Sequence, residues 1–121
     1  MAKILIVDDD ITMTRLIQTL LSMEGHESTV VNESTKAIEM AAAINPDLIT
    51  LDLMMPGMSG FEICELLRQD PRFTNTPILI VSASDDAASK LRARQLGARD
   101  YVTKPFNVDD FIQKVKDLTS A

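Results

Sequence analysis

The sequence is poor in residue types that would mark particular classes of protein. It has a single cysteine, Cys64, in 121 residues, which excludes an internal disulfide framework and a paired-cysteine metal site, and which suggests a reducing compartment. Its single histidine, His26, lies in a Gly-His-Glu turn, where we expect an exposed side chain without a functional role.

Long apolar runs and an excess of positive charge are also missing. The start MAKILIVDDD has about five apolar residues before three acids, which is too short for a signal peptide or a membrane span, so we expect a cytoplasmic protein. Twelve basic and 18 acidic residues give a net charge of -6. This charge argues against direct binding to nucleic acid or to an anionic membrane, and favours protein partners or cations.

The remaining composition is that of a globular protein. Hydrophobic residues make up 45% and charged residues 25% of the chain, close to the average for soluble proteins. A length of 121 residues suits one domain with one core, so we expect a single domain over residues 1–121.

Apolar runs of strand length alternate with helical patterns along the whole chain. The runs are 3–7, 28–31, 47–51, 77–81 and 99–102. The helical patterns are 11–23, 35–44, 60–68, 86–96 and a last stripe from Val108 to Leu118. The pattern at 86–96 has the weakest apolar stripe, so its packing should be the loosest. Strict alternation predicts an α/β fold with a parallel five-stranded sheet and helices on both faces.

Charged and polar residues follow these strands where the strands end. Asp8 and Asp9 follow the first run, Asp52 follows the third, Ser82 ends the fourth and Lys104 follows the fifth. Because the carboxyl ends of parallel strands share one edge, these side chains should converge there. Two carboxylates 4 Å apart repel by roughly 4 kcal/mol at an effective dielectric constant near 20. A divalent cation would relieve that repulsion, and oxygen ligands favour Mg²⁺ or Mn²⁺, which commonly bind phosphoryl groups.

Four segments resemble one known family. They are ILIVDDD, DLITLDLMMPGMSG, PILIVSAS and GARDYVTKPF, in this order and over essentially the whole chain. Together they are similar to the receiver domain of two-component response regulators. The resemblance implies a doubly wound, flavodoxin-like sheet in the order 2-1-3-4-5 flanked by five helices.

The resemblance also implies roles for residues of the acidic edge. Asp52 would accept a phosphoryl group from the phosphohistidine of a sensor histidine kinase or a histidine phosphotransfer protein. Asp9, Asp52 and the backbone carbonyl of Met54 would hold Mg²⁺, with Asp8 acting directly or through water. Lys104 would pair with Asp52 and later with a phosphoryl oxygen.

The same resemblance implies a conformational switch rather than a turnover enzyme. Ser82 would bind the phosphoryl group, and Tyr101 would turn from solvent toward the space that is vacated. The responding face would be formed by the helix at 86–96, the strand at 99–102 and the last helix. Its output partner is not specified by the sequence, and a phosphorylation-dependent dimer across this face is an alternative.

Three rival functions fit the sequence less well. A phosphohydrolase of the haloacid dehalogenase type needs a second aspartate two residues after its nucleophile, where this chain has Met54. A flavodoxin-like cofactor binder needs a phosphate loop rich in serine, threonine or glycine after the first strand, where this chain has acids. A docking module without phosphorylation would not need Asp52, Lys104 and Ser82 together.

Overall fold

Five parallel strands form the centre of the structure, a computed structural model that describes residues 1–120. The strands are β1 (Lys3–Val7), β2 (Glu27–Val31), β3 (Leu48–Leu51), β4 (Ile78–Ser82) and β5 (Asp100–Thr103). They pair in the order β2-β1-β3-β4-β5, and every pairing is parallel. The predicted fold class and strand order are therefore confirmed.

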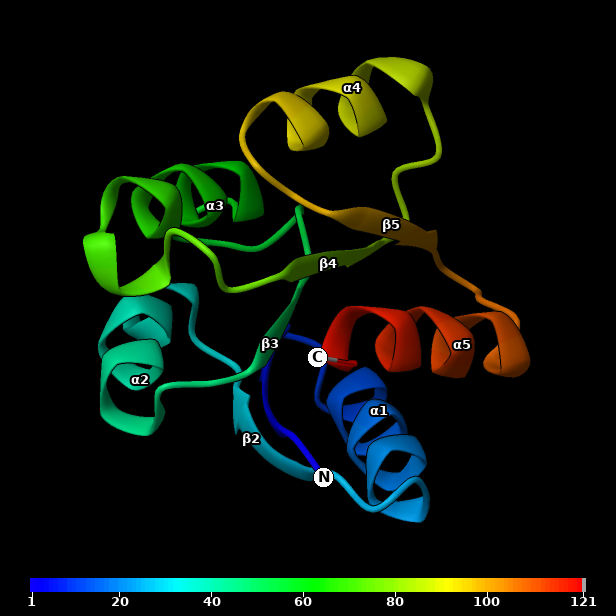
Figure 1. The fold of residues 1–121 in the computed structure, drawn as a ribbon. Helices are drawn as coiled ribbons and strands as arrows, with labels where there is room; N and C mark the ends of the chain where they lie inside the picture. Colours follow the sequence, from blue (N-terminus) through cyan, green and yellow to red (C-terminus); the bar gives the residue numbers. More distant parts are fainter. Residues whose placement is uncertain (121) are drawn as a thin grey trace.

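Five α-helices and two short 3-10 helices connect the strands. The α-helices are α1 (Ile11–Met23), α2 (Ala37–Ile44), α3 (Gly60–Gln69), α4 (Ala87–Gln95) and α5 (Val108–Thr119), and the 3-10 helices are η1 (Ser34–Lys36) and η2 (Pro71–Phe73). Helices α1 and α5 cover one face of the sheet, while α2, α3 and α4 lie on the other side (Figure 1). The sheet is thus enclosed on both faces, as its apolar strands require.

Most of the α-helices begin at a side chain that caps the first turn. In four of the five, the residue before the helix accepts a hydrogen bond from the N–H three residues further on; these caps are Asp10, Ser59, Asp86 and Asn107. Helix α2 instead continues directly from η1. The helix predicted to begin at residue 35 therefore has a 3-10 first turn.

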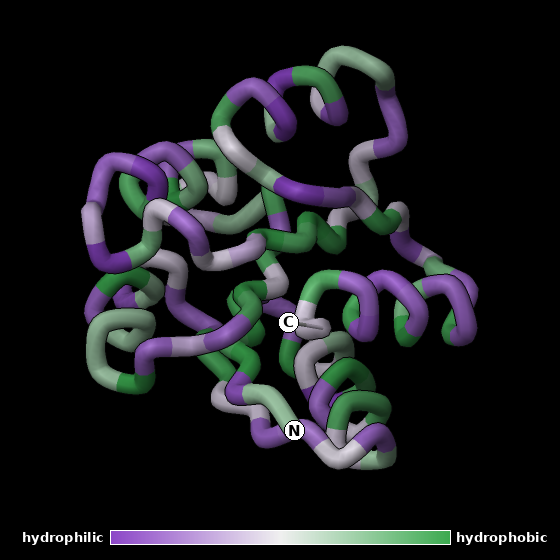
Figure 2. The backbone as a smooth tube through the Cα atoms, in the orientation of Figure 1, coloured by the Kyte–Doolittle hydropathy of each residue, from purple (hydrophilic) through white to green (hydrophobic). Residues whose placement is uncertain are grey.

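The core consists of one apolar layer on each side of the sheet. Every residue of β3 and β4 is buried, and the central strands are the most hydrophobic part of the chain (Figure 2). Helix α4 buries only Ala93, which agrees with its predicted loose packing. Within residues 1–120, no helix has the length and apolar character needed to cross a membrane.

Candidate functional site

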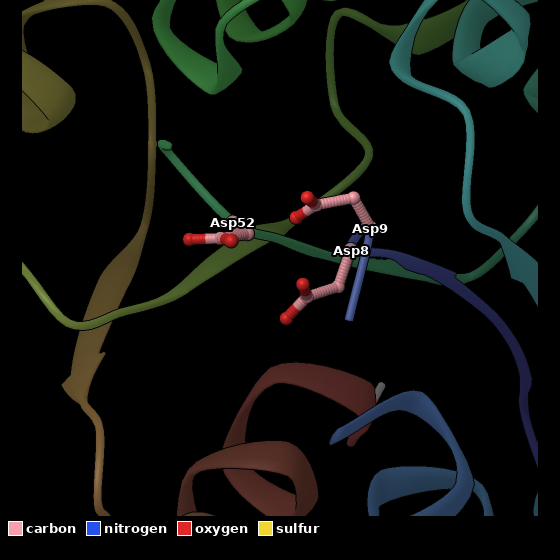
Figure 3. A group of neighbouring side chains, drawn as sticks. All are labelled: Asp8, Asp9 and Asp52. Atoms are coloured by element: carbon pink, nitrogen blue, oxygen red, sulfur yellow. The ribbon is translucent and has the colours of Figure 1, made fainter. Parts of the chain in front are cut away.

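Three carboxylates meet at the carboxyl edge of the sheet. The register pairs Val7 of β1 with Leu51 of β3, so the residues that follow them, Asp8 and Asp52, lie side by side. Together with Asp9 they offer oxygens within 4.8 Å of one another. Figure 3 shows the three side chains extending from the ends of β1 and β3 toward the same side. Their convergence, which the strand pattern predicted, is observed.

Lys104 joins this cluster from the far edge of the sheet. Its Nζ lies 2.6 Å from Oδ2 of Asp8 and 3.5 Å from Oδ2 of Asp52. The ammonium therefore reaches both carboxylates, but its closer partner is Asp8 rather than the expected Asp52. The peptide bond between Lys104 and Pro105 is cis.

The cluster holds more negative than positive charge away from water. Asp8 is 2% and Asp52 is 6% exposed. Burial, and then the charge of Asp8, raise the pKa of Asp52 above its ordinary value, and Lys104 offsets only part of this effect. Burial alone would lower the pKa of Lys104, but its hydrogen bond to Asp8 and the charges of both carboxylates raise it. The site thus favours additional positive charge, and its all-oxygen donors fit a hard divalent cation such as Mg²⁺.

Ser82 and Tyr101 both contact the loop between β4 and α4. Ser82 is fully buried, and its hydroxyl accepts a hydrogen bond from the N–H of Ser84 at 3.3 Å. The Tyr101 hydroxyl donates to the carbonyl of Ser84 at 2.6 Å. Tyr101 is half-buried in this structure, and its turn from solvent on phosphorylation stays a prediction.

Met54 lies at the rim of the cluster. Its N–H donates to Oδ1 of Asp52 at 3.4 Å, while its side chain is 67% exposed. The backbone of Met54 therefore lies against the carboxylate, and its thioether faces outward.

Two polar residues of the β2–α2 loop were missed by the sequence interpretation. Asn32 donates to the carbonyl of Asp8, and Ser34 contacts the loop that follows Asp52. Their position in the sequence could have revealed them. The carboxyl ends of all parallel strands share one edge, so the residues after β2 lie there too. The expected exposure of His26 is also wrong, because the side chain is half-buried and its Nδ1 accepts the N–H of Ala2 at 3.1 Å.

The fold and the acidic edge together define a flavodoxin-like α/β protein with a charged site at the ends of its strands. The family model of the response regulator receiver domain matches residues 4–116, and the chain therefore belongs to this family.

Curated relatives share the domain but are longer. The chain is 37% identical over 118 residues to the DNA-binding dual master transcriptional regulator RpaA of Synechocystis, covering 98% of this chain and 49% of that protein. It is 36% identical to the response regulator PleD of Caulobacter vibrioides, covering 98% of this chain and 26% of that protein. The chain thus spans half or less of the length of these relatives.

Solved structures agree with this assignment. A putative response regulator from Chloroflexus aurantiacus superposes with a TM-score of 0.94 at 30% identity, covering 99% of this chain and 98% of that one. The chemotaxis protein CheY4 of Vibrio cholerae superposes with a TM-score of 0.92 at 29% identity, covering 98% of both chains.

Proposed function

We propose that the chain is a cytoplasmic phosphorelay receiver that accepts a phosphoryl group on Asp52 from the phosphohistidine of a sensor histidine kinase or a histidine phosphotransfer protein. The observation that carries this proposal is the geometry of the acidic edge, where a buried carboxylate lies 3.5 Å from the ammonium of Lys104 and within the acidic cluster. The protein would act as a phosphorylated switch and not as a turnover enzyme.

The transfer follows from the chemistry of these side chains. A carboxylate oxygen of Asp52 forms a bond to phosphorus as the bond between phosphorus and the imidazole nitrogen breaks, and the electron pair stays on the imidazole. Lys104 balances the charge of the phosphoryl oxygens at the moment of transfer. Asp8, Asp9, Asp52 and the carbonyl of Met54 would hold Mg²⁺, or alternatively Mn²⁺, which supplies further positive charge to those oxygens when bound.

Burial supports Asp52 as the acceptor. Electrostatic interactions strengthen where water is excluded, so each compensating charge has a larger effect at a carboxylate that is 6% exposed than at the surface. Asp10 offers a contrast, because it is exposed and caps α1. Its role is structural.

Contacts of the β4–α4 loop connect the site to Tyr101 and to α4. The hydroxyl of Ser82 would donate a hydrogen bond to a phosphoryl oxygen on Asp52, while its oxygen accepts the N–H of Ser84 in the present structure. Ser84 is also bound through its carbonyl by Tyr101. Movement of the β4–α4 loop would therefore shift Tyr101 and the adjoining helix.

The responding face has room for an output partner. Lys90, Leu91, Arg94, Arg99 and Tyr101 contribute to an open groove of about 450 Å³ between α4 and β5. We propose that this face, together with α5, contacts an output protein, an attached domain or a second receiver. The name of the relative RpaA describes it as DNA-binding. We propose that the present domain does not itself contact nucleic acid.

Intact mass tests the proposal. The protein is incubated with acetyl phosphate and Mg²⁺, with and without EDTA, beside Asp52→Ala and the matched control Asp10→Asn. We expect a gain of one phosphoryl group in the wild type and in the control, and none with EDTA or in Asp52→Ala. No gain in the wild type, or an equal gain in Asp52→Ala, would contradict the proposal.

A further inference from the structure

The loop between β2 and α2 contacts both segments that carry the acidic cluster. Asn32 Nδ2 donates to the backbone carbonyl of Asp8 at 2.9 Å and to the hydroxyl of Thr14 at 3.3 Å. The backbone N–H of Asp8 in turn donates to the carbonyl of Val31 at 3.1 Å. The end of β1 is therefore held on its β2 side through both a backbone and a side-chain contact.

Ser34, two residues further on, holds the other segment. Its hydroxyl donates to the carbonyl of Pro56 at 2.8 Å and accepts the N–H of Met58 at 2.9 Å. The residue is 4% exposed, so both bonds are shielded from water. One buried hydroxyl thus bridges two positions of the β3–α3 loop.

The loop approaches Ser34 closely because of Gly57. This glycine has a φ of +84°, and a Cβ at this position would lie 3.0 Å from the Ser34 hydroxyl oxygen. A side chain here would strain the backbone and crowd the bridge at the same time. Glycine therefore suits this position for both reasons.

The far end of the same loop is fixed separately. The N–H of Gly60 donates to the carbonyl of Leu53 at 3.0 Å, and there is no room for a Cβ at Gly60 against the carbonyl of Asp52. The loop is thus fastened where α3 begins and, at its middle, by Ser34. Met54 lies between Asp52 and the part of the loop that Ser34 holds.

We propose that Asn32 and Ser34 are positioning residues that, together with the β1–β3 pairing in which the N–H of Asp52 donates to the carbonyl of Val7 at 3.0 Å, set the spacing between the Asp8–Asp9 segment and the Asp52–Met58 segment. Neither side chain contributes a carboxylate to the cluster, so both act through the backbone of the residues they hold. The inference rests on the proposed function, because the spacing matters for a cation and a phosphoryl group held between the two segments. Outer residues that orient metal ligands typically change metal affinity by about 10- to 100-fold when they are removed.

Mg²⁺ binding measures this role directly. The variants are Asn32→Ala, Ser34→Ala and the double variant. Thr35→Ala is the matched control, because it removes the hydroxyl of an exposed residue in the same loop. The dissociation constant for Mg²⁺ is obtained from amide chemical shifts, and the rate of phosphorylation by acetyl phosphate is measured over a range of Mg²⁺ concentrations. Thermal unfolding identifies any variant that does not fold, and Asn32→Ala, in a half-buried loop position, tests the inference if Ser34→Ala fails to fold.

We expect the dissociation constant to rise about tenfold in each single variant and further in the double variant. Saturating Mg²⁺ should restore most of the phosphorylation rate, and Thr35→Ala should match the wild type. A merely structural role would lower thermal stability and leave the Mg²⁺ constant unchanged. Constants within twofold of the wild type in both single variants would overturn the inference while the proposed function stood, whereas a wild type that gains no phosphoryl group would overturn the proposed function itself.

Discussion

Asp52 is 6% exposed and lies beside a second buried carboxylate, Asp8, with Lys104 as the ammonium that pairs with both. One positive charge balances only one of the two carboxylates. The pKa of Asp52 is raised because burial and Asp8 disfavour its ionised form. In the absence of a cation, ionised Asp52 therefore lowers the stability of the fold.

Replacing this carboxylate by an amide should stabilise the protein. At pH 7.5 without divalent cations, we expect Asp52→Asn to raise the free energy of unfolding by about 1 kcal/mol. The folded pKa of Asp52 lies above the ordinary value of about 3.9, so the cost of ionisation is absent below that value and complete above the raised pKa. The advantage of Asp52→Asn should accordingly shrink as the pH is lowered toward 4.

Urea unfolding at pH 7.5 and pH 4.5 measures this difference, with Asp109→Asn as an exposed control. A lower free energy of unfolding for Asp52→Asn than for the wild type, or a stability gain that grows as the pH falls, would contradict the cost of ionising Asp52.

Thr50 carries a second unfavourable group, two residues before Asp52 on β3. Its hydroxyl is buried and has no hydrogen-bond partner among residues 1–120. We expect Thr50→Val to raise the free energy of unfolding by about 1 kcal/mol, because the unpaired hydroxyl is replaced by a methyl group of similar shape. Chemical denaturation of both proteins measures the change.

Thr14→Val is the matched control for that substitution. Thr14 is equally buried, at 1% exposure, but its hydroxyl donates to the carbonyl of Ile11 at 3.0 Å. Its loss should lower the free energy of unfolding by about 1 kcal/mol. Equal effects of the two substitutions would show that the Thr50 hydroxyl has a partner after all.

Residue types and strand ends were enough to predict that the three carboxylates and Lys104 meet at the edge. They were not enough to predict that Lys104 lies closer to Asp8, at 2.6 Å, than to Asp52, at 3.5 Å, because residue types do not resolve so small a difference in side-chain distance. Ser34 was missed for a similar reason, since a serine in a polar loop carries no sign that a glycine 23 positions later brings the backbone against it.

At the scale of elements, α4 is held unevenly. It buries one residue, Ala93, whereas α3 buries four. Just beyond its C-terminal end, the carbonyl of Gly97 accepts two hydrogen bonds from Arg68 of α3, at 3.0 and 2.8 Å. The same guanidinium donates to the carbonyls of Phe73 and Thr76, both at 2.7 Å. The C-terminal end of α4 is therefore fixed to the body of the protein.

Arg68 should be important for stability. Burial lowers the pKa of this guanidinium, yet it serves three backbone carbonyls that Met could not satisfy. We expect Arg68→Met to lower the free energy of unfolding by about 3 kcal/mol. Arg72→Met, which removes an exposed arginine that pairs with Asp70, should cost less than about 1 kcal/mol. Denaturant unfolding measures both variants. A similar, small decrease in the free energy of unfolding in both would contradict the role of Arg68 as the anchor of the C-terminal end of α4.

Because its C-terminal end is fixed by Arg68, α4 should move mainly at its N-terminal end. We expect its amides to exchange with solvent faster than those of α1 or α3, since few buried contacts oppose local opening. Acetyl phosphate with Mg²⁺ should change exchange more at residues 84–90 than at 93–97, because the second segment leads into the Arg68 anchor. Hydrogen exchange followed by mass spectrometry resolves both segments. A larger change at 93–97 would place the hinge elsewhere.

Most element boundaries could be predicted from periodicity and caps. The range of α1 matches its expected limits of 11–23, and α4 was correctly expected to pack loosely. The anchor at Arg68 could not be predicted, because an arginine on a helix pattern is ordinarily solvent-exposed. The partners of Arg68 are backbone carbonyls. Because every residue has one, the residue types of a sequence do not show which carbonyls accept its hydrogen bonds.

At the scale of the whole molecule, the net charge of -6 and the buried acids both favour cation binding. If the folded state alone binds Mg²⁺, a concentration 100 times the dissociation constant should add about 2.7 kcal/mol to the free energy of unfolding. EDTA should reverse this gain, and Asp52→Asn should lose most of it. Thermal unfolding in Mg²⁺ and in KCl of equal ionic strength separates the specific effect from screening. Equal stabilisation by both salts would contradict a specific site.

The overall architecture was the most predictable level. Strands that are apolar at nearly every position need helices on both faces, and alternation along the chain leaves few other arrangements. The strand order entered through the resemblance to receiver domains, and the structure confirms it.

The pair between Asp8 and Lys104 joins residues 96 positions apart in the chain. Closing so long a segment costs conformational entropy, which must be met by the packing of β3, β4 and β5 before the pair can form. During synthesis, the first half of the chain leaves the ribosome before the second. At that point Asp8, Asp9 and Asp52 are present, but Lys104 is not. The complete charge arrangement at Asp52 therefore exists only after the entire sheet has folded, so the proposed transfer to Asp52 would require a completely folded domain.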